Sequence, residues 1–68
     1  MTEEKVHIHS VGQLYLAELI RQMLADNDIP AFIINKQDSA YKFGDIEIYT
    51  YRDGVIPAKK LIQEFESQ

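Results

Sequence analysis

Asp45-Ile46-Glu47-Ile48-Tyr49-Thr50-Tyr51, at residues 45–51, is the stretch that decides the fold of this 68-residue chain. Its residues alternate, and the two faces consist of Ile46, Ile48 and Thr50 on one side and Glu47, Tyr49 and Tyr51 on the other. Alternation with a period of two predicts a β-strand that buries one face and leaves the other open. Other parts of the chain must therefore cover the apolar face of this strand.

Two further segments are predicted to be strands beside residues 45–51. Lys5 to Ser10 alternates in the same way, and its two faces consist of Val6 and Ile8 on one side and His7 and His9 on the other. Ala31 to Ile34 is a short apolar run between chain breakers, which favours a strand over a buried helix.

The segment between the first two strands is predicted to be a helix. Ser10-Val11-Gly12-Gln13 matches a capping box, in which the serine hydroxyl accepts a hydrogen bond from the backbone N–H of Gln13. Apolar residues then recur at helical spacing and form one stripe: Leu16, Leu19, Ile20, Met23 and Leu24. The polar cluster Asp26-Asn27-Asp28 ends the helix, with Asn27 or Asp28 in a left-handed conformation.

A second helix is predicted over the stretch that contains residues 58–65. Its apolar stripe consists of Ala58, Leu61, Ile62 and Phe65. Pro57 suits the first helical turn, where its missing N–H costs little. The sequence leaves open whether Asp53 caps this helix.

The predicted order of elements is β-α-β-β-α, an α+β fold. The helical crossover makes the first two strands parallel, and the eight-residue connection to the third favours an antiparallel hairpin. With residues 45–51 in the middle, the sheet has the order 1-3-2 and both helices lie on one face, as in a ferredoxin-like plait that lacks its fourth strand. We expect residues 1–68 to form a single domain with a flexible tail at residues 1–4. We also expect the sheet edge along residues 5–10 to be paired or covered.

Composition narrows the classes of function. The chain has seven Lys plus Arg, eleven Asp plus Glu, a net charge of −4 and no Cys. It therefore has no disulfide framework, thiolate nucleophile or cysteine-type zinc site, and its acidic balance argues against nucleic acid as a partner. We expect a cytoplasmic protein with no membrane partner, because the first residues are polar and no apolar run is long enough to span a bilayer.

Two places are candidate binding sites. The connection at residues 36–43 is longer than a tight turn needs, and the residues expected to bind a ligand or partner there are Lys36, Asp38, Ser39 and Tyr41. The sheet face away from the helices is expected to be an interaction face, made up of His7, His9, Glu47, Tyr49 and Tyr51, because Tyr is enriched at protein interfaces.

Other chemistry has less support in the sequence. His7, His9 and Glu47 form a minor alternative as a zinc site, because two histidines two residues apart on a strand project from the same face. No glycine-rich phosphate loop and no nucleophile–base pair is evident. We therefore expect no catalytic residues, no bound metal and no cofactor.

A family resemblance covers nearly the whole chain. It rests on residues 16–24 followed by Asp28-Ile29-Pro30-Ala31-Phe32, then on Gly44-Asp45-Ile46-Glu47-Ile48, and finally on Ala58-Lys59-Lys60-Leu61-Ile62. In these motifs the chain resembles a small bacterial family of otherwise unknown function, described as prokaryotic signal-transducing proteins. Leu16 and Asp28 stand where that family usually has Glu and Gly. The resemblance implies a fold similar to the nitrogen-regulatory PII proteins and a regulatory role, with no established ligand and no catalytic residues.

These observations predict a small regulatory module, and not an enzyme, that binds a small ligand or a partner protein. The alternative is a purely structural interaction domain, which forms a homodimer or docks a partner through the open sheet edge or the Tyr/His face.

Overall fold

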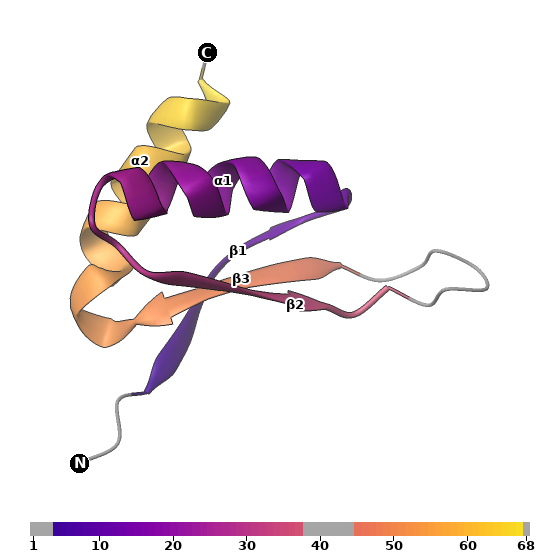
Figure 1. The fold of residues 1–68 in the computed structure, drawn as a ribbon, viewed down its shortest axis with the longest axis horizontal. Coiled ribbons are helices and arrows are strands. Elements are labelled where there is room, and N and C mark those ends of the chain that lie inside the picture. Colours follow the sequence, from indigo (N-terminus) through magenta and orange to yellow (C-terminus); the bar gives the residue numbers. More distant parts are fainter. Residues whose placement is uncertain (1–3, 38–44, 68) are drawn as a thin grey trace.

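The central strand of the sheet is β3 (Ile46–Tyr51), as the alternation predicts. A computed structural model describes residues 4–37 and 45–67. In it, β1 (Lys5–Val11) and β2 (Ala31–Asn35) pair antiparallel with β3 on its two sides, so the sheet order is β1-β3-β2. The predicted α+β class, the element order and the strand order are confirmed (Figure 1).

Both helices lie on one side of the sheet (Figure 1). α1 (Leu14–Asp26) connects β1 to β2, and α2 (Val55–Glu66) follows β3 after a short 3₁₀ turn, η1 (Arg52–Gly54). The core between helices and sheet is formed by Ile8, Ala17, Ile20, Leu24, Ile29, Ile46, Ile48, Ala58 and Ile62. The molecule is therefore two layers thick, and one layer is the sheet itself.

The predicted start of α1 is wrong. Ser10 belongs to β1, and the residue that precedes the helix is Gln13, which makes no side-chain capping bond. The Ser10 hydroxyl lies 2.7 Å from Nε2 of His7, a neighbour in the strand. The end of the helix agrees with the prediction, because Asp28 has a φ of 62° and the Asn27 side-chain amide donates to the Met23 carbonyl.

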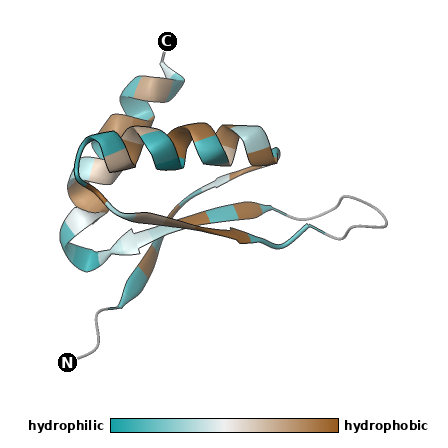
Figure 2. Ribbon diagram, in the orientation of Figure 1, coloured by the Kyte–Doolittle hydropathy of each residue, from teal (hydrophilic) through white to brown (hydrophobic). Residues whose placement is uncertain are grey.

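The buried stripe of α1 is narrower than predicted. Ala17, Ile20 and Leu24 are its buried residues, whereas the side chain of Leu19 is 52% exposed. Ala17 was absent from the predicted stripe, although its small side chain is fully buried. The helix therefore presents apolar side chains on both its inner and its outer side (Figure 2).

A β-bulge interrupts the alternation of β1. His7 pairs with Tyr49 and His9 pairs with Ile48, so Ile8 is an extra residue without its own partner on β3. Beyond the bulge the two faces of the strand are exchanged: Ser10 lies opposite Glu47, and Val11 lies opposite the buried Ile46. The bulge thereby lets Ile8 and Val11 both pack against the core, which strict alternation would forbid.

α2 begins without a side-chain cap. Gly54 precedes its first turn and Asp53 lies in η1, which answers the question that the sequence left open. Pro57 is the third residue of the helix, within the first turn as predicted. No helix in the described ranges, 4–37 and 45–67, is long and apolar enough to cross a membrane.

Candidate interaction face

One side of the sheet carries a continuous set of side chains that point away from the helices. Because Ile46, Ile48 and Thr50 of β3 are buried under the helices, the alternate residues of β3 and their cross-strand neighbours lie on the opposite side. We call this set the open face: Lys5, His7, Ser10, Phe32, Ile34, Glu47, Tyr49 and Tyr51. Within the described residues, no helix lies over it (Figure 1).

Aromatic rings occupy the middle of the open face. The ring centroids of Phe32 and Tyr51 are 5.2 Å apart at an interplanar angle of 73°, and those of His7 and Tyr49 are 5.5 Å apart at 75°. Both pairs have the edge-to-face geometry that aromatic side chains favour. Nζ of Lys5 lies 4.5 Å from the centroid of the Phe32 ring, a cation–π distance. The rings are therefore held in defined orientations before any partner binds.

A polar cluster adjoins the rings. The Tyr49 hydroxyl donates to Oε1 of Glu47 at 2.7 Å, and Nζ of Lys36 lies 3.2 Å from the same oxygen. The hydroxyl of Tyr49 and the ammonium of Lys36 hold the pKa of Glu47 below its ordinary value. In return, Glu47 raises the pKa of Lys36 and of Tyr49. This arrangement favours the carboxylate, the ammonium and the neutral phenol together.

The expectation that His9 shares a face with His7 is wrong. The bulge places His9 opposite Ile48, on the helix side of the sheet. There Nε2 of His9 lies 2.8 Å from Oε2 of Glu66 in α2, so His9 ties the end of that helix to β1. The alternative zinc site therefore loses one of its three ligands, and no group of metal-binding side chains occurs within residues 4–37 and 45–67.

The other predicted site residues divide into two groups. His7, Glu47, Tyr49 and Tyr51 lie together on the open face as expected. Lys36 is exposed and reaches the same face through Glu47. Asp38, Ser39 and Tyr41 lie outside the described residues.

Sequence reasoning missed the contribution of β2 to the open face. Phe32 pairs with Tyr49 and Ile34 pairs with Glu47, so both point away from the helices. The run Ala31 to Ile34 is apolar throughout, and no alternation marks which side chains are buried. The predicted strand order could have revealed this contribution. Once residues 31–34 pair with the alternating β3, every second side chain of that strand must point to the open face.

A groove at the far end of the sheet is a weaker candidate. It has a volume of about 820 Å³, and its lining includes Glu4, Asp28, Arg52 and Asp53. Arg52 pairs with Glu4 at 3.0 Å, and the buried Thr50 hydroxyl donates to the Pro30 carbonyl at 2.6 Å. No buried side-chain polar atom of the described residues lacks a hydrogen-bond partner.

Comparisons of the chain with protein-family models, with curated proteins and with solved structures found no match. The resemblance to the signal-transducing family stays a prediction, and the open face is the feature of the molecule that bears on function.

Proposed function

We propose that this protein is a small regulatory binding module that docks a partner protein on the open face of its sheet. The observation that carries the proposal is the row of aromatic side chains, Phe32, Tyr49 and Tyr51, beside the exposed Ile34. Aromatic residues are enriched at the centres of protein interfaces, and a contiguous exposed apolar patch is typical of an interaction site. The proposal assigns no catalytic role to these residues.

The fixed ring geometry favours binding. Holding Phe32 against Tyr51 and His7 against Tyr49 restricts these side chains in the free protein. Less side-chain entropy is then lost when a partner packs on them. The residues of the open face are thus suited to act as preorganised anchors.

The charges on the open face favour a protein partner over a nucleic acid. Within residues 4–37 and 45–67, Glu47 is paired with Lys36, which leaves Lys5 as the cation placed over the rings. One such cation is far from the basic surface that neutralisation of a phosphate backbone requires. We expect the partner to present an apolar or aromatic segment with a carboxylate placed to meet Lys5.

Site-specific photo-crosslinking tests this proposal. A photoreactive amino acid is placed at Ile34, which is 43% exposed on the open face, and, as a matched control, at Ile56, which is 82% exposed at the start of α2. In cells that naturally contain the protein, we expect position 34 to crosslink a discrete partner whose mass differs from that of this chain, and we expect the crosslink to be lost on adding Tyr51→Ala. Equal crosslinking from both positions, or none from position 34, would contradict the proposal.

A ligand-sensing role is the second candidate, and the contact between Lys36 and Glu47 favours it. Lys36 is the first residue of the predicted binding connection and contacts Glu47 of the open face, so a ligand held at the connection would alter the cluster around Glu47. Amide NMR spectra recorded with nucleotides, 2-oxoglutarate, amino acids and divalent metals test this role. We expect shifts that include Lys36 and Glu47. Unchanged spectra across the panel would leave partner docking as the function.

A further inference from the structure

The two edge strands of the sheet, β1 and β2, are not equally protected against pairing with a strand of another chain. β1 carries the bulge at Ile8 and begins with a lysine, and both features discourage pairing with another strand. β2 reads Ala-Phe-Ile-Ile-Asn, and its register with β3 is unbroken, without charge, proline or bulge. Figure 2 shows it hydrophobic along most of its length. Among residues 4–37 and 45–67, the edge along β2 is therefore the one without a feature that discourages pairing.

The backbone groups at this edge can be assigned. The N–H of Lys36 donates to the carbonyl of Asp45 at 3.1 Å, which extends the pairing of β2 with β3. Because inward and outward groups alternate along an antiparallel strand, Ala31, Ile33 and Asn35 direct their N–H and C=O groups away from β3. Within the part of the chain that the structure describes, the outward backbone groups of these three residues have no backbone partner.

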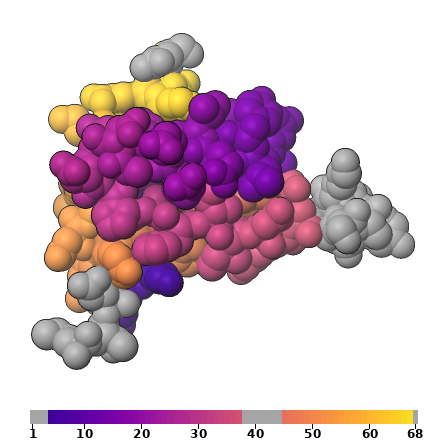
Figure 3. All heavy atoms as spheres, viewed as in Figure 1, coloured from indigo at the N-terminus to yellow at the C-terminus, as the bar shows by residue number. Residues whose placement is uncertain are grey.

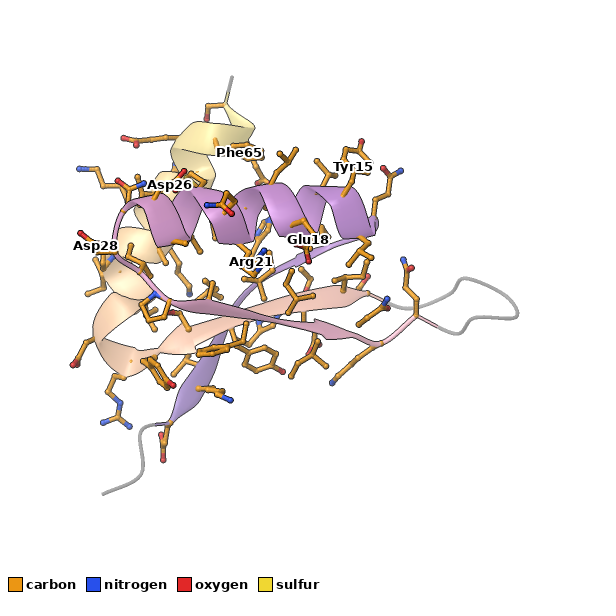
Figure 4. All side chains as sticks on the ribbon, viewed as in Figure 1. Tyr15, Glu18, Arg21, Asp26, Asp28 and Phe65 are labelled. Carbon is orange, nitrogen blue, oxygen red and sulfur yellow. The ribbon has the colours of Figure 1, made fainter. Side chains whose placement is uncertain are left out.

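α1 lies next to the same edge. Figure 3 shows α1 and β2 side by side on one face of the molecule, and Figure 4 shows Glu18 and Arg21 on the part of the helix toward β2. Nη2 of Arg21 lies 2.9 Å from Oε2 of Glu18. Leu14, in the first turn of the helix, is 48% exposed. The edge of β2 and the flank of α1 thus make one surface with apolar and oppositely charged groups.

We propose that a second copy of this chain binds at this surface, with β2 paired antiparallel to β2 about a two-fold axis through Ile33. The result is a six-stranded sheet with the two copies of α1 side by side. A two-fold interface requires a surface that is complementary to itself. Ile33 is the middle residue of β2, so the outward groups of Ala31 face those of Asn35 in the second copy.

The charges on α1 are compatible with the same symmetry. Glu18 and Arg21 lie on either side of the middle of the helix, which runs from Leu14 to Asp26. In the proposed dimer the axis passes between these two residues, so antiparallel copies of α1 place Arg21 of one chain opposite Glu18 of the other, twice. This complementarity is our reason to choose a second copy over an unrelated partner. The inference is independent of the proposed function, because it uses the sheet edge and not the open face.

Sedimentation of the full chain tests the inference. We expect a dimer whose dissociation constant rises roughly tenfold in Arg21→Glu, because two exposed ion pairs become repulsive. The double variant Glu18→Arg/Arg21→Glu should restore the dimer, and Lys60→Glu, at an exposed cation of α2, should leave it unchanged. A monomer at chain concentrations up to about 1 mM would overturn the inference, since even weak dimers populate there. A dimer insensitive to Arg21→Glu would also overturn it.

Hydrogen exchange supplies a readout that needs no variant. The amide of Ile33 should become protected as the chain concentration rises, whereas the amides of Phe32 and Ile34, already directed toward β3, should not change. Circular dichroism confirms that each variant is folded. An Ile33 amide that exchanges at the same rate at all concentrations would contradict the pairing.

Discussion

At the scale of single residues, Gly54 at the start of α2 lies so close to Thr50 and Ile29 that a larger side chain at this position would crowd them. A Cβ atom at Gly54 would lie 3.0 Å from Oγ1 of Thr50 and 3.1 Å from Cγ2 of Ile29. Thr50 is fully buried and its hydroxyl is already bonded to the Pro30 carbonyl. The added methyl group therefore requires both neighbours to shift by a few tenths of an ångström.

Gly54→Ala should therefore destabilise the protein by about 1–3 kcal/mol, the usual cost of overpacking. Gly12→Ala is the matched control, because nothing lies within 4 Å of the added methyl group. It should change the free energy of unfolding by less than about 0.5 kcal/mol. Urea denaturation measures both variants. Equal stability of the two would show that the loop at Gly54 relaxes freely.

The contacts among Glu47, Tyr49 and Lys36 predict that the stability of the protein depends on pH both below and above neutrality. The pKa of Glu47 is lowered by Tyr49 and Lys36, so its contribution to stability is present above the ordinary carboxyl range and is lost as the pH falls through the lowered pKa. The pKa values of Lys36 and Tyr49 are raised by Glu47, so their contributions are present below the ordinary range, about pH 10, and are lost as the pH rises through the raised values.

Glu47→Gln should lower the pKa of the Tyr49 phenol toward its ordinary value and weaken the dependence of stability on acid pH. NMR titration of the Tyr49 ring and urea denaturation at several pH values measure the two effects. Glu18→Gln is the control, because that carboxylate pairs with Arg21 on α1 and not with Tyr49. A Tyr49 titration that is unchanged in Glu47→Gln would mean that the hydrogen bond does not persist in solution.

At the scale of elements, α1 shows how far periodicity predicts burial. Helical spacing identified Ile20 and Leu24 correctly, but it also included Leu19, which is 52% exposed. Spacing every three to four residues defines a broad stripe, and the packing of α1 against the sheet and α2 selects part of it. The predicted capping box at Ser10 is wrong because strand pairing outweighs the local capping pattern: β1 extends to Val11 and includes Ser10.

Leu24→Ala should cost about 2–5 kcal/mol, because it removes buried methyl groups and leaves a cavity. The same change at the half-exposed Leu19 should cost clearly less than about 1 kcal/mol. Chemical denaturation compares the two variants on one helix. If Leu24 is so costly that the variant does not fold, the milder Ile20→Val, expected to cost about 0.5–1.5 kcal/mol, replaces it. Similar losses at positions 19 and 24 would contradict the burial described here.

At the scale of the whole molecule, helices cover one side of the sheet, and the three strands differ in how many neighbouring strands they pair with. β3 has a hydrogen-bonded neighbour on each side, whereas β1 and β2 each have one in a single chain. Opening the central strand requires that the core between helices and sheet be broken. Local stability should therefore be highest in β3.

Amide hydrogen exchange at low chain concentration should be slowest for Ile46, Ile48 and Thr50 of β3. The outward amides of β2 and the last turn of α2 should exchange faster. The measurement is made below the concentration at which the chain associates, so that an intermolecular contact does not contribute. Exchange from β3 as fast as that from the outward amides of β2 would contradict this order of local stability.

The sequence by itself determined the elements and their order, because period-two and helical patterns are local and the chain is too short for many arrangements. The alternation in β3 also determined which side chains of that strand form the open face. Only the tertiary structure decided the faces of β1 and β2. One extra residue at Ile8 exchanges the faces of the strand beyond it, so His9 moved to the helix side and Val11 to the core. The apolar run of β2 has no alternation of its own, and its faces follow only from its pairing with β3.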